Sequence, residues 1–187
     1  MPSELITERL RLRQWTDADR APYAALNQDP AVMRFFAGLQ SREASDRDVD
    51  RWRAELDARG WSNWAVETRA SGQFIGFIGL SIPRRALSFM PCVELGYRLA
   101  AAHWGRGLAT EGARAALKLG FEQLGLDEIV SFTATINLPS RAVMERVGMT
   151  HANEDFDYPN PALPDRLRRH CLYRLRRDAW IRLAGET

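Results

Sequence analysis

The 187-residue sequence predicts one domain of the α/β (α+β) class, in which helices flank a mixed sheet. Apolar and polar residues alternate with a period of two in several short segments, as they do in half-buried strands. Amphipathic segments with helical spacing lie between them, and one long helix separates two strands as a crossover does. The length, the 45% hydrophobic fraction and the lack of a dividing linker fit a single domain over residues 1–187.

The first third of the chain predicts a strand followed by helices. Leu10 and Leu12 alternate with arginines, which is the pattern of a half-buried strand. Segments with helical spacing follow, and the breakers Asp29-Pro30 and Gly60 end two of them. The expected elements are, in order, a strand over 6–14, a helix over 19–27, a helical turn over 32–37 and a helix over 45–59.

The middle third predicts strands. The turn Ala70-Ser71-Gly72 separates two apolar segments as in a hairpin. In the third strand Leu95 and Tyr97 alternate with Glu94 and Arg98, so the two pairs face opposite sides of the sheet. The expected elements are strands over 64–68, 74–82 and 92–99, with a loop over 84–91 whose tip is apolar.

The last third predicts a crossover and further strands. Pro139 lies in the first turn of a short helix that Gly148 ends. The expected elements are a helix over 108–124, a strand over 128–136, a helix that ends at residue 147, a strand over 149–153, a proline-rich loop over 155–165 and a strand over 167–175. Antiparallel hairpins therefore come first, and a strand–helix–strand crossover comes later.

The charge distribution argues against a nucleic-acid-binding protein. The chain has 26 basic and 24 acidic residues, a net charge of +2, and Lys118 is its only lysine. The arginines are spread evenly, and acidic residues accompany each group of them. A protein that binds the phosphate backbone usually has a strongly positive region. An arginine-mediated RNA- or ribosome-binding module is therefore kept only as an alternative.

Sequence signals of several other protein classes are missing. No apolar run reaches the roughly 18–20 residues of a membrane helix, and the start of the chain lacks the apolar core of a signal peptide. Cys92 and Cys171 lie far apart, and the three histidines have no metal-ligand spacing. We therefore expect a cytoplasmic protein without membrane contact, disulfides or a metal site.

The most informative segment runs from the strand over 92–99 through a glycine-containing loop into a helix. Gly105 and Gly107 allow the backbone to approach an anion, and amides at a helix start point outward toward one. Arg106 between them adds a full charge. A Gly-Lys-Ser/Thr run and a third glycine are both missing, so the loop is neither a Walker A loop nor a Rossmann fingerprint. A pyrophosphate site and a simple turn both fit these glycines.

The segment Trp104-Gly-Arg-Gly-Leu-Ala109 resembles the acetyl-CoA loop of the GNAT N-acetyltransferases, whose pattern is Gln/Arg-x-x-Gly-x-Gly/Ala. The similarity extends to Glu94-Leu-Gly-Tyr97, to Asn137-x-x-Ser140 and to the opening segment over 7–13. These segments resemble the branch of ribosomal-protein-alanine N-terminal acetyltransferases. One position departs from the broad family, because Trp104 stands where Gln or Arg is usual.

The resemblance implies a GNAT fold and acetyl-CoA as the co-substrate. The fold is a mixed, mostly antiparallel sheet of six to seven strands, flanked by about four helices, with its fourth and fifth strands splayed. Pantetheine would lie in the gap between the strands over 93–99 and 129–136, and the pyrophosphate would lie on the loop. The implied cofactor-binding residues are Tyr97, Arg98, Leu99, Trp104, Gly105, Arg106, Gly107, Leu108, Ala109, Thr110, Asn137 and Ser140.

The resemblance also implies two catalytic residues. Glu94 would take the proton of the amine, and Ser140 would protonate the leaving thiolate. Each has a structural alternative, since Glu94 could bond within the sheet and Ser140 could cap a helix. Neutralising an amine at pH 7 costs about 4.6 kcal/mol for a pKa of about 10.4, but about 1.4 kcal/mol for an α-amino group with a pKa near 8.

The implied function is acetyl transfer from acetyl-CoA to a primary amine, either a protein N-terminus or a small molecule. An acyl-CoA sensor or scaffold without catalysis is a second hypothesis. A homodimer through the apolar tip at 87–90 is a further expectation. Aromatic residues that could line an acceptor pocket are Tyr23, Phe35, Phe36, Trp61, Trp64, Phe89 and Phe156.

Overall fold

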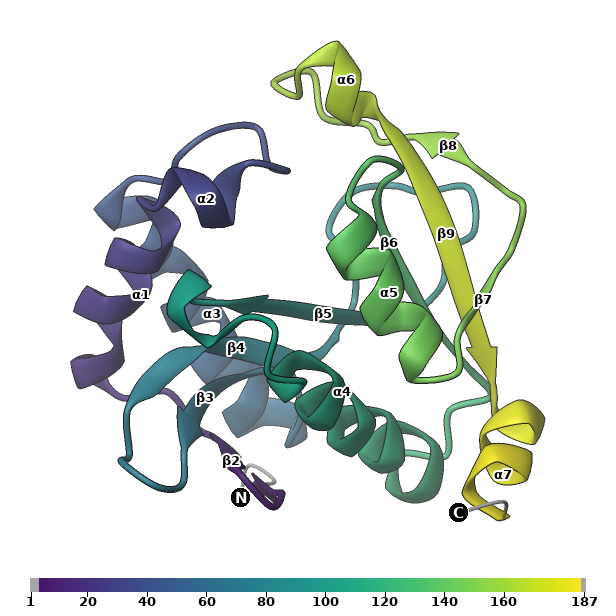
Figure 1. The fold of residues 1–187 in the computed structure, drawn as a ribbon, viewed down its shortest axis with the longest axis horizontal. Coiled ribbons are helices and arrows are strands. Elements are labelled where there is room, and N and C mark those ends of the chain that lie inside the picture. Colours follow the sequence, from purple (N-terminus) through teal and green to yellow (C-terminus); the bar gives the residue numbers. More distant parts are fainter. Residues whose placement is uncertain (1–3, 186–187) are drawn as a thin grey trace.

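The computed structural model describes residues 4–185 and contains a mixed sheet with helices on both faces (Figure 1). The strand order is β1-β2-β3-β4-β5-β6-β9-β7, and β8 pairs with β9. Every pairing is antiparallel except that of β5 with β6. The strands are β1 Leu5–Ile6, β2 Leu10–Arg13, β3 Asn63–Thr68, β4 Phe74–Ser81, β5 Glu94–Leu99, β6 Glu128–Ala134, β7 Thr150–His151, β8 Phe156–Asp157 and β9 Arg169–Arg176.

The helices divide between the two faces of the sheet (Figure 1). Phe77 of β4 packs on one face against Trp52, while its neighbour Ile78 contacts Gly112 on the other. The first face therefore carries α1 and α3, and the second carries α4. The α-helices are α1 Arg20–Asn27, α2 Pro30–Met33, α3 Arg42–Arg59, α4 Leu108–Lys118, α5 Leu138–Arg146, α6 Asp165–Arg168 and α7 Arg177–Gly185.

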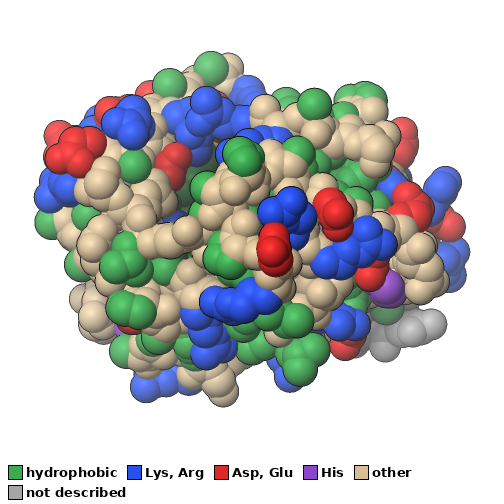
Figure 2. Space-filling model, turned by 90° about the horizontal axis from the view of Figure 1, so that it is seen from above, with side chains coloured by type: hydrophobic (Ala, Val, Ile, Leu, Met, Phe, Trp, Pro, Cys, Tyr) green, Lys and Arg blue, Asp and Glu red, His purple; other side chains and the backbone are tan. Residues whose placement is uncertain are grey.

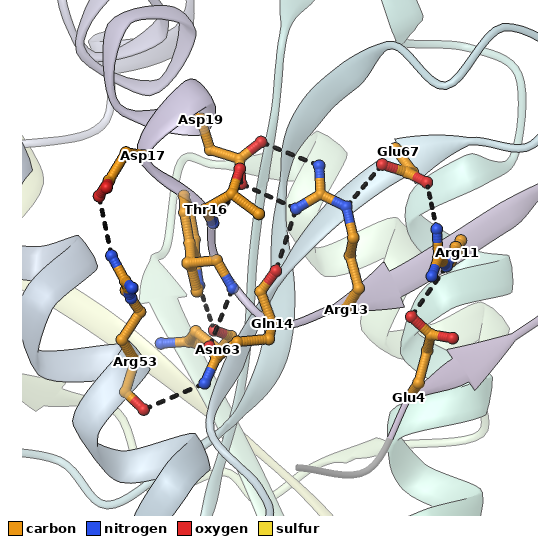
Figure 3. A network of polar contacts seen from close by, with 11 residues as sticks. Glu4, Arg11, Arg13, Gln14, Thr16, Asp17, Asp19, Arg53, Asn63 and Glu67 are labelled. Carbon is orange, nitrogen blue, oxygen red and sulfur yellow. Dashed lines mark hydrogen bonds and ion pairs between the residues drawn. The ribbon is translucent and has the colours of Figure 1, made fainter. Parts of the chain in front are cut away.

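An ion-pair network ties β2 to the helical layer (Figure 3). The Arg13 guanidinium donates to both carboxylate oxygens of Asp19, at 2.7 and 2.9 Å, and also to Glu67. Burial alone would raise the pKa of Asp19, but hydrogen bonds from Arg13 and Thr16 outweigh it and hold the pKa below its usual value. Because Asp19 is only 2% exposed, this pairing is a structural requirement of the fold.

Strands β5 and β6 diverge soon after they meet. Their register contains one pair, Glu94 with Val130, and the Val130 amide also donates to the Val93 carbonyl. Beyond Glu94 the two strands separate, and the Tyr97 side chain reaches across to Ser140 of α5. The splay expected of these two strands is thus confirmed, and it exposes the backbone edge of β5.

Most predicted elements are present, and the fold class is confirmed. The expected sheet of six to seven strands has nine in the described residues, because the strand predicted over 6–14 forms two strands, β1 and β2, and β8 lies in the predicted loop over 155–165. The strand predicted over 6–14 is broken, since the Thr7 amide and hydroxyl both bond to the Leu10 carbonyl in a turn. Helix α7 was not predicted, and the described chain has seven α-helices rather than about four.

Candidate active site

A cleft of about 660 Å³ opens where β5 leaves β6. Backbone and side chains of β5, the loop after it, α2 and α5 form its walls. Arg34, Arg98 and Arg146 line it, and among the described residues around it there is no Asp or Glu. By contrast, arginines and carboxylates are interspersed on the face shown in Figure 2. The cleft therefore suits a ligand that carries several negative charges.

The loop at the mouth of the cleft presents free backbone amides. Gly105 and Gly107 have left-handed φ values of +71° and +75°, which explains why glycine occupies both positions. Within the described chain no hydrogen bond is made by the amides of residues 105–110, and Gly107 begins α4. These amides and the partial positive charge at the helix start can hold a diphosphate. The geometry fits the pyrophosphate that coenzyme A would bring.

Side-chain contacts fix this loop. The Trp104 indole donates to the Leu99 carbonyl at 2.8 Å, and Arg34 lies 5.4 Å above the Trp104 ring. Arg9 donates to the Arg106 carbonyl at 2.9 Å and pairs with Glu111 at 2.6 Å. Trp104 thus anchors the loop to β5, a role that the family pattern did not suggest, and Glu111 serves structure rather than chemistry.

Eleven of the twelve predicted cofactor-binding residues line the cleft. The exception is Arg106, whose side chain is exposed and is not part of the lining. Its expected charge contribution is therefore not visible in the cleft. Residues that line the cleft and were not predicted as cofactor-binding include Arg34, Val143 and Arg146. They lie far from the glycine loop in the sequence, on α5 and beside α2, so no local motif marks them.

Ser140 lies inside α5 and does not cap it. The cap is Asn137, whose Oδ1 accepts from the Ser140 amide at 3.3 Å. The Tyr97 hydroxyl lies 2.9 Å from both the carbonyl oxygen and Oγ of Ser140. If Tyr97 donates to the carbonyl, the Ser140 hydroxyl donates to Tyr97, and a proton can pass along this pair. The structural alternative for Ser140, helix capping, is therefore wrong, since Asn137 performs it.

Glu94 is a carboxyl without a partner. It shares the face of β5 with Gly96 and Arg98, and no described residue gives it a hydrogen bond or an ion pair. Glu94 keeps an intermediate solvent-exposed area, but protein atoms surround its carboxyl group. This burial raises the pKa of Glu94 to about 8. The nearby Cys92 thiol has its pKa raised to about 11, first by burial and then by Glu94. The alternative in which Glu94 bonds within the sheet is not observed.

Half-buried aromatic rings lie on the same face of the sheet as Glu94. Phe132 of β6 contacts Phe89, Phe156 and Tyr158, with ring centroids 5.7 to 5.9 Å apart. Tyr158 has its pKa raised by burial and then by the charge of Glu94, so the two lie close together. This aromatic cluster, composed of Phe89, Phe132, Phe156 and Tyr158, forms an apolar wall beside the carboxyl.

The aromatic residues proposed from the sequence lie in different places, and two of them, Phe89 and Phe156, belong to the aromatic cluster. Phe35 and Phe36 line the cleft, as expected for a pocket. Tyr23 and Trp64 are fully buried in the core, so they are wrong as pocket residues. Trp61 stacks under Arg59 at 3.9 Å. Phe89 turns inward to the aromatic cluster, so the apolar tip at 87–90 is only partly available for a contact between two chains.

The described residues carry neither a cluster of metal ligands nor a membrane-spanning helix. No group of three or more His, Cys, Asp or Glu residues could hold a metal ion within residues 4–185. Over the same residues, no helix has the length and hydropathy needed to cross a membrane.

Comparisons with known proteins agree on one family. Residues 9–150 match the family model described as "Acetyltransferase (GNAT) domain". The chain is 34% identical to the FsC-acetyl coenzyme A-N(2)-transacetylase of Aspergillus fumigatus, over 96% of this chain and 78% of that protein. It is 32% identical to the uncharacterized protein YkkB of Bacillus subtilis, over 80% and 87% of the two chains.

A solved acetyltransferase of Agrobacterium tumefaciens has a TM-score of 0.74 and 29% identity, covering 94% of this chain and 95% of that one. The chain therefore belongs to the GNAT acetyltransferase family and is an acetyl-CoA-dependent acyltransferase.

Proposed function

We propose that this protein transfers the acetyl group of acetyl-CoA directly to a primary amine. The observation that carries the proposal is the Glu94 carboxyl, unpaired and enclosed, on the strand that borders the cofactor cleft. A buried carboxyl without a partner lowers stability, so it is expected where its chemistry is used.

The splay of β5 from β6 gives the two reactants different approaches to the gap. The cleft lies at the far end of β5 and reaches both of its faces, since Tyr97 and Arg98 both line it. Glu94 lies at the near end, where β5 still pairs with β6, beside the aromatic cluster. A thioester held in the gap could be reached by the amine from the side of Glu94, while the coenzyme extends along the cleft.

The proposed step has a balanced proton count. The amine nitrogen attacks the thioester carbonyl carbon, the N–C bond forms and the C–S bond breaks. Glu94 takes one proton from the nitrogen, directly or through a water molecule. The departing thiolate receives a proton from Ser140, which Tyr97 can replace through the 2.9 Å contact between the two hydroxyls. Glu94 then gives its proton to solvent and Tyr97 takes one from solvent, which restores both groups. The products are an amide and coenzyme A as its thiol.

The proton that the amine loses before attack favours acceptors of the α-amino kind. Neutralising an α-ammonium group with a pKa near 8 costs about 1.4 kcal/mol at pH 7. For a lysine-like ammonium with a pKa of about 10.4, the same loss costs about 4.6 kcal/mol. Glu94 then takes a second proton as the N–C bond forms. Either a peptide N-terminus or a small molecule could supply such an amine.

The names of similar proteins support amine acetylation in general. One relative is named for transfer to N(2) of FsC. Neighbours in fold include a spermidine N-acetyltransferase of Vibrio cholerae, in a chimera, and RimJ of Mycobacterium smegmatis with CoA-disulfide. Their identities of 19% and 20% support the fold only, so the acceptor class rests on the chemistry of this chain.

A coupled binding and turnover experiment tests the proposal. Acetyl-CoA should raise the melting temperature of the protein. NADH and ATP should not, because the loop is neither a Rossmann fingerprint nor a Walker A loop. Free thiol should then be released with an amine panel that contains an alanyl peptide, ornithine, spermidine and benzylamine. Binding without thiol release would favour an acyl-CoA sensor, and absence of acetyl-CoA binding would refute the proposal.

A further inference from the structure

A row of three residues crosses the sheet beside Glu94. Asn63 of β3 pairs in register with Gly79 of β4, and Gly79 pairs with Gly96 of β5. Since neither glycine has a side chain, the Asn63 carboxamide can lie across the row. Its Oδ1 lies 3.8 Å from the position that a Cβ on Gly96 would occupy. The row therefore brings Asn63 to the face of β5 that carries Glu94.

The Asn63 carboxamide is buried, yet its oxygen has no partner. The residue is 6% exposed, and no donor in the described chain reaches Oδ1. The backbone carbonyl of Asn63 accepts from the Trp15 indole at 2.8 Å, so of its two oxygens Oδ1 is the one without a donor in the described chain (Figure 3). Buried acceptors normally find a donor, because leaving one unpaired forfeits its hydration. An unpaired oxygen of this kind indicates a donor that arrives with a ligand.

We propose that Asn63 and Glu94 together bind the nitrogen of the acceptor, which must therefore be an unsubstituted primary amine. This inference rests on the proposed function and assigns its acceptor subsite. A primary ammonium has three N–H donors, of which one can go to Asn63 Oδ1 and one to the Glu94 carboxylate. The third proton is the one that is lost before attack. An N-methylated amine has too few protons to keep both bonds after it is deprotonated.

The space for the nitrogen is shaped by the glycines. A Cβ at Gly96 would meet only Asn63 Oδ1 at 3.8 Å and the Phe77 ring at 3.9 Å, both ordinary contacts. The position is thus open enough for a small group. A Cβ at Gly79 would approach the Ser62 carbonyl at 2.2 Å, so that glycine is needed for the close packing of β3 on β4. The space beside Gly96 is open to a ligand, whereas the space beside Gly79 is filled by the backbone of β3 and the residue before it.

The surroundings of the subsite agree with a compact cationic nitrogen. Arg98 on the same face donates through Nη1 to Asn27 at 2.6 Å and stacks on Phe36 at 4.0 Å, while its buried Nε has no partner in the described chain. Tyr158 adds an aromatic ring close to Glu94, and aromatic faces attract cations. The carbon chain of the acceptor would then lie along the aromatic cluster.

The Asn63→Leu variant tests the role of the carboxamide. It removes the unpaired oxygen with little change in volume, so the melting temperature should stay the same or rise, and the Kd for acetyl-CoA should not change. The acceptor KM should increase about 10- to 100-fold, measured with the panel amine that has the highest kcat/KM. The kcat at saturating amine should fall far less, since Glu94 still accepts the proton.

Tyr23→Phe is the matched control. The Tyr23 hydroxyl is also fully buried and lies beside Asn27 without meeting hydrogen-bond geometry, but it is enclosed in the aromatic core. Its removal should leave the acceptor KM within twofold of wild type. With the wild type, N-methylation of the same acceptor should lower kcat/KM at least 10-fold relative to the unsubstituted amine. With Asn63→Leu, N-methylation should lower kcat/KM by a smaller factor.

Gly96→Ala gives an independent steric test. The methyl group should fill the space of the nitrogen, so acetyl transfer should fall more than 10-fold while the melting temperature and acetyl-CoA binding are kept. Gly79→Ala should instead lower the melting temperature, because its methyl group meets backbone. If the wild type is active, and both Asn63→Leu and Gly96→Ala keep the wild-type acceptor KM, the inference is overturned and the proposed function stands. If the wild type acetylates no primary amine, both are overturned.

Discussion

Replacing Glu94 with Gln separates the chemistry of this site from its packing. Gln has nearly the same shape as Glu but cannot take a proton, and the enclosed carboxyl has no partner that the change would strand. We expect kcat/KM at pH 7 to fall by roughly 10²-fold or more, the usual contribution of a general base. Binding of acetyl-CoA should be unchanged, because Glu94 does not line the cofactor cleft.

The pH dependence gives a sharper expectation. With a pKa of about 8, the Glu94 carboxyl is about one-tenth ionised at pH 7 and about nine-tenths ionised at pH 9. An α-amino acceptor also needs to lose a proton, so log(kcat/KM) of the wild type should rise toward a slope of two below pH 7. The Glu94→Gln variant keeps only the titration of the amine, and its slope should approach one.

The same carboxyl predicts a stability difference that needs no substrate. Its pKa is raised from 4.5 in a model peptide to about 8 in the fold, so the folded state binds the extra proton between these values. Stability from this group is complete below pH 4.5 and is lost as the pH rises through 8. Between pH 6 and 9 the wild type should lose about 2.5 kcal/mol relative to Glu94→Gln, as an upper limit because solvent screens a half-buried group.

The measurements are thiol release from pH 5.5 to 9.5 and urea denaturation of both proteins at pH 6 and pH 9. Acetyl-CoA titrations of each protein control for the cofactor site. Equal slopes for the two proteins, together with less than a threefold loss of kcat/KM, would show that Glu94 is not the base. If the free energy of unfolding changes equally between pH 6 and pH 9 in the wild type and in Glu94→Gln, the pKa of Glu94 is not raised.

Three further predictions concern other parts of the molecule. Arg13→Ala should destabilise the fold by about 3–5 kcal/mol in urea, since it leaves the buried Asp19 carboxylate unpaired; a loss below 1 kcal/mol contradicts this. Ser140→Ala should lower kcat but keep the acetyl-CoA Kd within a few-fold. If the two hydroxyls form one proton path, adding Tyr97→Phe to Ser140→Ala should lower kcat by a smaller factor than Tyr97→Phe lowers it in the wild type. Cys92, with a pKa of about 11, should react with iodoacetamide at pH 8 about 10²-fold more slowly than free cysteine, as followed by mass spectrometry; a rapid reaction would show that its thiol is not shielded.

The separation of the proposed base from the cofactor cleft along β5 has a consequence for specificity. The cofactor cleft is built from the loop after β5, α2 and α5. The acceptor side is built from the row of Asn63 and its glycines together with the aromatic cluster. Acceptor preference can therefore change through β3 and the loops around residues 89 and 158 without change to the cofactor loop.

The sequence by itself determined the fold class, the order of most elements and the cofactor loop. These features depend on local patterns: period-two alternation for strands, caps and breakers for helices, and two glycines before a helix. It also placed the side chains of Glu94 and Tyr97 on opposite faces of the sheet, because alternation along a strand fixes which face each side chain occupies. The short strand β8 escaped, since two residues carry no periodicity.

Only the tertiary structure decided which distant residues meet. Asn63 and Gly96 are 33 positions apart, and nothing local marks an asparagine whose side chain crosses a glycine to reach the next strand. Likewise the sequence left open whether Ser140 acts in catalysis or caps a helix. The helix geometry makes Asn137, which also lines the cleft, the cap, and it leaves the Ser140 hydroxyl facing Tyr97. Pairing register and burial depend on contacts between remote segments, and the free-energy cost of an unpaired buried group is visible only once the fold has enclosed it.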